Sequence, residues 1–124
     1  MASGKPLSPS TQAWADATST LGNALMALSD DEGGSEKLGE AHSAFCAVLE
    51  NTDIERAPFQ WAISQSMIGA VLVRLGEWKH QPALRHEAVE AFEQALTKLT
   101  RERVPRQWGS VQANLGHTLY FASR

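Results

Sequence analysis

The chain carries an internal repeat of 47 residues, and this feature constrains its fold more than any other. When the sequence is shifted by 47 positions, residues 14–60 align with residues 61–107 without a gap. Fifteen of the aligned pairs are identical, whereas average composition would give roughly three by chance. A further copy begins at residue 108 and runs to residue 124. Repeats of this length are typical of units that stack side by side and share one core.

Each copy has the pattern of two amphipathic helices. Apolar side chains recur three, four or seven positions apart, which is the spacing of one helix face. In the first helix of each copy this stripe comprises Trp14, Leu21, Leu25 and Leu28, and then Trp61, Ile68, Leu72 and Leu75. The second helices carry a matching stripe with Ala41 and Phe45, and then Ala88 and Phe92. We expect these stripes to face a common core.

Glycine and proline mark the expected helix boundaries. Gly76 is expected to end its helix, with "EWKHQP" at residues 77–82 as the following loop. The peptides "ERAPFQWA" at 55–62 and "ERVPRQWG" at 102–109 are expected to join one hairpin to the next. Their prolines, Pro58 and Pro105, should end the outgoing helix and suit the first turn of the incoming one. The tryptophan three residues later should fill the junction.

A glycine recurs at the same position of each first helix, as Gly22, Gly69 and Gly116. Glycine inside a helix costs about 1 kcal/mol relative to alanine, so another interaction must compensate for it. We expect a close approach between paired helices, with Ala41 and Ala88 supplying the small surface opposite the glycines.

The order of these residues resembles the signature of the tetratricopeptide repeat (TPR) family. The matching residues are Leu21-Gly22, Leu25, Ala41, Phe45 and Pro58, then Ile68-Gly69, Leu72, Ala88, Phe92 and Pro105, then Leu115-Gly116 and Leu119. The resemblance covers residues 14–124, although the usual unit has about 34 residues. It is greatest to the long-helix variants found in bacterial multi-repeat proteins.

This resemblance implies an all-α fold, a TPR-like right-handed α-superhelix of two antiparallel helical hairpins plus a terminal half-repeat helix. The repeats would occupy residues 14–60 and 61–107 and the half repeat residues 108–124, after a flexible N-terminal segment at residues 1–13. A plain antiparallel helical bundle is the alternative.

The resemblance also implies a non-enzymatic protein–protein interaction scaffold whose first helices line a concave groove for a peptide or a partner helix. The expected groove residues are Asn23, Ile63, Ser66, Met67, Ala70, Arg74, Asn114, His117 and Tyr120. Ser19 stands where TPR domains that bind the carboxylate tails of chaperones carry a lysine. We therefore expect a neutral or apolar peptide, anchored by Arg74. The competing interpretation of this face is an idle solvated surface.

The third copy contains a first helix and no second one, yet it keeps Leu115, Leu119 and Phe121. Either the native chain continues, as part of a longer repeat array, or a second chain covers this apolar strip. The alternative function is therefore a structural self-assembly module, whose exposed terminal helix drives oligomerisation. The simplest such homo-oligomer is a two-fold dimer.

The sequence contains no pattern typical of catalysis, cofactor binding or metal binding. Its histidines, His42, His80, His86 and His117, form no H-x-x-x-H pair, and Cys46 lies on a second helix, where we expect no close ligand partner for it. We therefore expect no enzyme activity, cofactor or metal. Trp78, which lies outside the repeat pattern, is expected to cap helix ends or to be a contact point for a partner.

Charge and composition bound the partners and the compartment. The net charge of −3 gives no reason to expect nucleic acid or a membrane as partner. The one basic cluster, Lys98, Arg101, Arg103 and Arg106, is expected to complement the carboxyl end of a helix. A single cysteine and an N-terminus without an apolar leader favour the cytoplasm.

Overall fold

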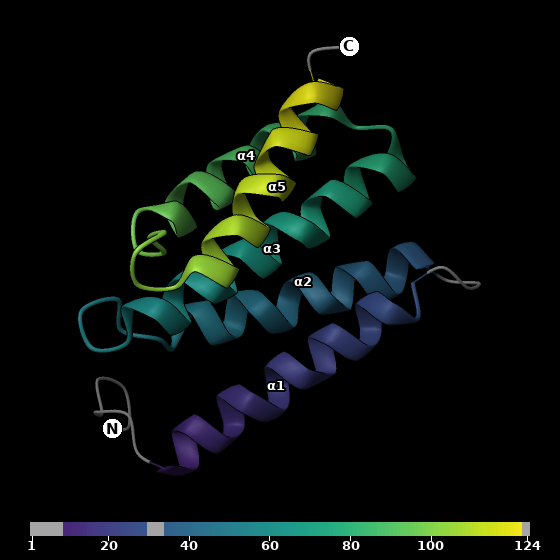
Figure 1. Ribbon diagram of the computed structural model, residues 1–124. Helices are drawn as coiled ribbons and strands as arrows, with labels where there is room; N and C mark the ends of the chain where they lie inside the picture. The colour runs from purple at the N-terminus through teal and green to yellow at the C-terminus, as the bar shows by residue number, and fades with distance from the viewer. Residues whose placement is uncertain (1–8, 30–33, 123–124) are drawn as a thin grey trace.

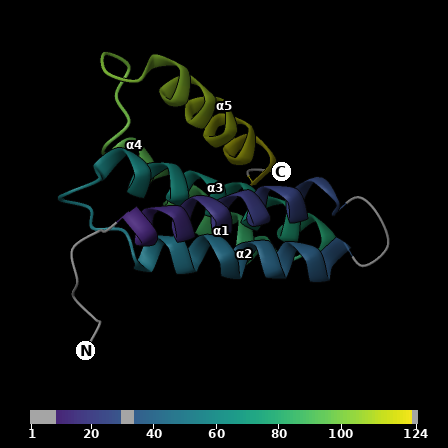
Figure 2. The same ribbon diagram turned by 90° about the horizontal axis from the view of Figure 1, so that it is seen from below.

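The computed structural model describes residues 9–29 and 34–122, and these residues form five helices and no strand. The helices are α1 (Pro9–Ala27), α2 (Gly34–Glu50), α3 (Pro58–Lys79), α4 (Pro82–Leu96) and α5 (Pro105–Ala122). Each helix packs against the next along the chain, and α5 also contacts α3 (Figures 1 and 2). The predicted all-α class is therefore confirmed.

The repeated peptide forms the same junction twice. α3 begins at Pro58 and α5 begins at Pro105, which are equivalent positions of the repeat. The amide of Ala57 donates to the carbonyl of Asp53 at 2.8 Å, and the amide of Val104 donates to the carbonyl of Thr100 at 2.9 Å. The amides of Trp61 and Trp108 then donate to the carbonyls of Ala57 and Val104. The two junctions thus share their hydrogen bonds as well as their residues.

The prolines begin the incoming helices but do not end the outgoing ones, so that part of the prediction was wrong. α2 ends at Glu50 and α4 at Leu96, well before Pro58 and Pro105. Polar side chains satisfy the last carbonyls instead: Asn51 Nδ2 donates to Ala47 O at 2.8 Å, and Thr97 Oγ1 donates to Gln94 O at 2.6 Å. α1 also starts earlier than expected, at Pro9, and residues 1–8 lie outside the described part.

α3 continues past Gly76, where the sequence analysis placed its end. Gly76 lies buried within the helix, and its carbonyl accepts the amides of both His80 and Gln81. His80 has φ 52°, the left-handed conformation that commonly closes a helix. Only His80 and Gln81 separate α3 from α4, so most of the predicted loop is helical.

The predicted close approach is confirmed at Gly22 and Gly69 but not at Gly116, and the partner is a phenylalanine ring rather than an alanine. A Cβ atom added at Gly22 would lie 2.7 Å from Cζ of Phe45, and one at Gly69 would lie 2.7 Å from Cε1 of Phe92. The exposed fractions of the two phenylalanines are 1% and 0%. Each ring therefore occupies the space that a side chain at the glycine would fill, and its burial compensates for the glycine.

The predicted apolar stripe of α1 does not face the core over its whole length. Trp14, Leu21 and Leu28 are 41%, 55% and 50% exposed. Their equivalents in α3 are at least half-buried because α2 packs along that side of α3. Among the described residues, no helix precedes α1 to cover it. The three equivalent tryptophans of the repeat consequently differ in environment, with Trp61 and Trp108 half-buried and Trp14 exposed.

The three glycines make a matched mutational test. We expect Gly69→Leu to destabilise the protein by about 2–3 kcal/mol, because the new side chain must displace the buried Phe92 ring. Gly116→Leu should be neutral or stabilising by up to about 1 kcal/mol, since no atom lies within 4 Å of an added Cβ there. Urea unfolding of both variants measures the difference, and equal destabilisation would contradict the ring-on-glycine packing.

Candidate peptide-binding site on α1, α3 and α5

A cavity of about 290 Å³ lies between α1, α3 and α5. It is lined by Met26, Ala70, Val73, Arg74, Glu77, Phe92, Asn114, His117 and Thr118. Four of the predicted groove residues are therefore brought together here: Ala70, Arg74, Asn114 and His117. They come from α3 and α5, while Met26 contributes from α1, so the lining joins helices that lie far apart in the sequence.

The other predicted groove residues lie elsewhere on the same helices. Ile63 lines a second cavity of about 200 Å³ between α1, α2 and α3, which also contains Ser19. Met67 is half-buried against the core, and Ser66 donates its hydroxyl to the carbonyl of Ile63 at 2.7 Å. Asn23 and Tyr120 are exposed and line neither cavity.

Arg74 connects α3 to the carboxyl end of α1. Its Nη1 donates to the carbonyl of Met26 at 2.8 Å and to Ser29 Oγ at 3.1 Å. The Ser29 hydroxyl is buried and itself donates to Met26 O at 2.7 Å. The Met26 carbonyl also accepts the amide of Ser29 at 3.1 Å, so Arg74 adds a charge-assisted hydrogen bond at the carboxyl end of α1, where a positive charge is favourable. Sequence reasoning placed Arg74 in the groove but missed this structural role, because the pairing spans more than forty positions.

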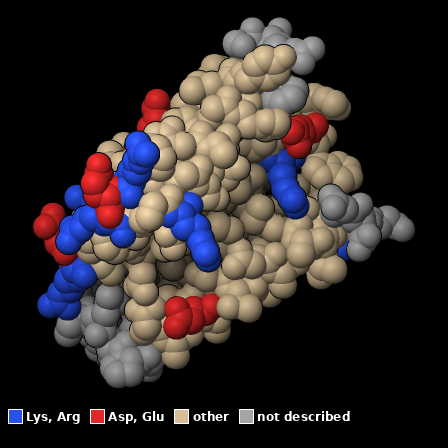
Figure 3. Space-filling model, viewed as in Figure 1, with Lys and Arg blue, Asp and Glu red and all other residues tan. Residues whose placement is uncertain are grey.

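Most of the side chains that line this cavity are uncharged. Arg74 and Glu77 are the charged residues in its lining, and His117 is the titratable side chain that α5 contributes to that lining. Figure 3 shows a face on which uncharged side chains predominate, with charged groups gathered mainly near the α2–α3 and α4–α5 turns. Such a site can enclose a small apolar side chain and offer hydrogen bonds at its rim.

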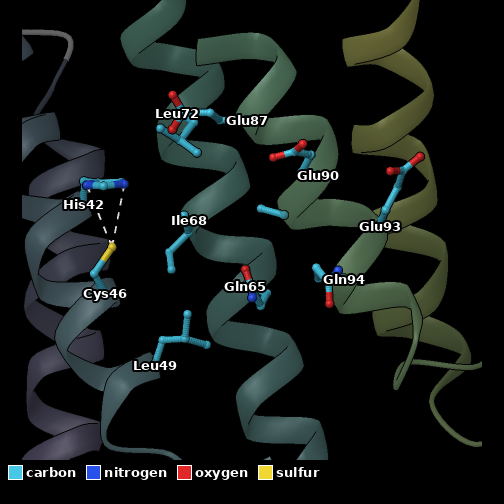
Figure 4. A pocket seen from close by; sticks show the side chains of 11 residues that line it. His42, Cys46, Leu49, Gln65, Ile68, Leu72, Glu87, Glu90, Glu93 and Gln94 are labelled. Atoms are coloured by element: carbon cyan, nitrogen blue, oxygen red, sulfur yellow. Dashed lines mark hydrogen bonds between the residues drawn. The ribbon is translucent and has the colours of Figure 1, made fainter. Parts of the chain in front are cut away.

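A larger hollow of about 680 Å³ lies between α2, α3 and α4 (Figure 4). His42 and Cys46 line it from α2, and Glu87, Glu90 and Glu93 line it from α4. Cys46 Sγ lies 3.7 Å from His42 Nε2, so the thiol has a close partner that the sequence analysis did not give it. Among the described residues, no group of three or more side chains is arranged to hold a metal ion.

The Cys46 thiol is held in its protonated form. Burial raises its pKa above the ordinary value of 9.0, and the nearby negative charge of Glu50 raises it further. A thiol is far less nucleophilic than a thiolate, so Cys46 is poorly suited to covalent chemistry near neutral pH.

The basic cluster does not lie at a helix carboxyl end, contrary to expectation, because α4 already ends at Leu96. Arg101 and Arg103 lie in the α4–α5 turn, and Arg106 lies in the first turn of α5. The guanidinium carbon of Arg101 lies 5.8 Å from the ring centre of Trp108, and that of Arg103 lies 5.7 Å from that of Phe59. Both positions are within range of a cation–π interaction across the repeated junction.

Trp78 fits the first of its two predicted roles. It lies in the last turns of α3 and is half exposed, and its ring packs over Gly34 at the start of α2. An added Cβ at Gly34 would lie 2.7 Å from Cζ2 of Trp78. The indole therefore covers one end of α2.

Compared with models of known protein families, with curated proteins and with solved structures, the chain matched none. Within the described part of the chain, no helix combines the length and the apolar character needed to cross a membrane.

The Arg74 interaction predicts a local loss of stability. Arg74→Ala should destabilise the protein by about 2 kcal/mol, since it removes charge-assisted hydrogen bonds from partly buried oxygens. Hydrogen exchange should become faster at the last amides of α1, which are those nearest to Met26 and Ser29. Arg106→Ala, at an exposed position, is the control. Unchanged exchange in α1 would contradict this role.

The raised pKa of Cys46 predicts that its thiol reacts slowly with disulfide reagents. We expect Ellman's reagent to react more slowly with the native chain at pH 8 than with the chain unfolded in urea. The rate for the native chain should keep rising above pH 9, where the unfolded thiol is already largely ionised. Because the folded state favours the protonated form, the stability contributed by this group should fall as pH rises above 9. Identical pH profiles for native and unfolded chains would refute the shift.

Proposed function

We propose that this protein is a non-enzymatic scaffold of the TPR-like type, which binds a peptide or a helix of a protein partner on the face of α1, α3 and α5. The observation that carries the proposal is the cavity in which Ala70, Arg74, Asn114 and His117 come together. In a superhelix of stacked hairpins, the first helix of each pair lines the concave side. The structure contributes the stacking order of the helices and the cavity, and the right-handed superhelix is part of the proposal.

The lining favours a short neutral or apolar segment as ligand. Val73, Ala70 and Met26 give an apolar floor, and exposed Asn114 offers both a donor and an acceptor to a peptide backbone. A volume of about 290 Å³ is small for a whole ligand site, since pockets for drug-sized molecules occupy about 300–1,000 Å³. We therefore assign this cavity to one anchoring side chain, with the rest of the peptide lying along the helices.

Arg74 would act in this site mainly through its position. Its Nη1 is engaged by α1, which fixes the guanidinium at the edge of the cavity. An ordered guanidinium loses little further freedom when a ligand carbonyl reaches its other nitrogens. The Arg74 guanidinium, which is the expected anchor, is thus held in position before the peptide binds.

Two substitutions, each of which replaces an alanine by glutamate, test the groove. Peptides selected from a random phage-displayed library against the whole protein should bind the unmodified chain in calorimetry. Ala70→Glu, which places a carboxylate in the cavity, should weaken that binding at least 10-fold. Ala83→Glu makes the same change at an exposed position of α4 and should have no effect. Circular dichroism of both variants verifies that they are folded, and equal affinities for the two would argue against the groove.

Self-assembly through the terminal helix is a second candidate, favoured by the exposure of apolar residues there. Leu119 is 47% exposed, whereas Leu115 packs half-buried against the core. The side chain of Phe121 lies outside the described part. Of the three residues predicted for self-association, Leu119 is therefore the one whose exposure supports this candidate.

A further inference from the structure

One side of α5 has the residues of a helix–helix interface, but none of the helices described in residues 9–29 and 34–122 packs against it. Gly109 and Gly116 are seven residues apart on this side, and no atom lies within 4 Å of a Cβ added at either. Leu119 continues the same side and is 47% exposed. α5 lies at the outer edge of the array in Figure 2 and packs against α4 and α3 on its other side.

The repeat shows what covers this side elsewhere in the molecule. The positions equivalent to Gly116 and Leu119 are Gly22 and Leu25 in α1 and Gly69 and Leu72 in α3. The glycine of the first pair meets a ring of α2, the glycine of the second pair meets a ring of α4, and both leucines pack in or against the core. In both cases the ring that meets the glycine is a buried phenylalanine, four residues after an alanine that is itself 0% exposed. Two of three equivalent surfaces are thus occupied by the same helical pattern, Ala-x-x-x-Phe.

We propose that the side of α5 formed by Gly109, Gly116 and Leu119 is a docking surface for an amphipathic helix of another protein that carries Ala-x-x-x-Phe. The phenylalanine ring would lie over Gly116 as Phe92 lies over Gly69, with the docked helix antiparallel to α5. This surface is separate from the cavity on α1, α3 and α5, so the proposal stands independently of the groove.

The absence of charged residues from most of α5 agrees with an apolar helix as the partner of this surface. Residues 107–122 contain no Asp, Glu, Lys or Arg, although many of their side chains are exposed. Uncharged exposed faces are unusual for a surface helix and are typical of the centre of an interface. The face therefore favours an apolar helix over an acidic or a basic one.

A second copy of this chain is a poor occupant of the surface. Its two Ala-x-x-x-Phe helices, α2 and α4, already bury Phe45 and Phe92 against their own glycines. Either helix would have to leave its own core before it could dock on α5. Docking of α2 or α4 from a second copy is therefore disfavoured, and self-association is an outcome that the test must separate.

The α4 sequence itself provides the probe. A fluorescein-labelled peptide of residues 80–101, "HQPALRHEAVEAFEQALTKLTR", is titrated with the full-length chain and followed by anisotropy. We expect saturable 1:1 binding, and at least 10-fold weaker binding for the peptide in which the phenylalanine is changed to alanine. Because short isolated helices are marginally stable, the same segment is also fused after Arg124 through a flexible Gly/Ser linker. The fusion should raise the melting temperature, and the phenylalanine-to-alanine fusion should not.

Two chain variants locate the binding. Gly116→Leu fills the position proposed for the docked phenylalanine ring and should weaken peptide binding at least 10-fold, whereas Ala83→Glu, at an exposed position of α4, should leave it unchanged. Binding that is insensitive to Gly116→Leu, or no binding together with no stabilisation of the fusion, would overturn the proposal. Light scattering of the chain alone completes the test. A dimer that Gly116→Leu converts to monomer would identify a second copy as the occupant and would also overturn it.

Discussion

The contact between a phenylalanine ring and a helical glycine is the interaction on which this architecture depends. It occurs twice, with Phe45 on Gly22 and Phe92 on Gly69, and in each case ring and glycine are separated by the same number of positions. The missing side chain lets the paired helices approach closely, and the fully buried ring provides the apolar burial that offsets the cost of glycine in a helix. Each hairpin therefore contains one close contact that neither helix could make alone.

The junction between hairpins determines how these pairs are arranged. Pro58 and Pro105 pre-set the first turn of the incoming helix, and the same two backbone hydrogen bonds close each junction. Consequently α1, α3 and α5 follow one another with α2 and α4 between them in the chain, and the cavity proposed to bind a peptide forms where these three helices meet. Arg74 reinforces this arrangement, because it connects α3 to the end of α1 across the gap between hairpins.

The repeat makes the unoccupied surfaces of the array interpretable. An exposed leucine on a helix is ordinary, but Leu119 and Gly116 have counterparts that are covered inside the same molecule. The outer side of α1, with Trp14, Leu21 and Leu28 exposed, is open in the same way, since its counterpart on α3 is covered by α2. A stack of hairpins leaves such a surface at each end, and contact with another polypeptide is one means of covering it.

The sequence by itself determined the helical class, the repeat, the junction peptide and the importance of the glycines, because periodicity, proline and glycine act over a few neighbouring positions. Only the tertiary structure decided which side chains meet. It showed that the glycines face phenylalanine rather than alanine and that Arg74 bonds to α1. It also showed that three of the four residues of the α1 stripe, all except Leu25, are exposed. The end of α3 was predicted wrongly for a related reason. Gly76 is buried within α3 because Leu84 and Arg85 pack beside it, and the left-handed residue that closes the helix is His80. These outcomes depend on which helix packs opposite a given residue, and the spacing of residues within one helix does not specify that helix.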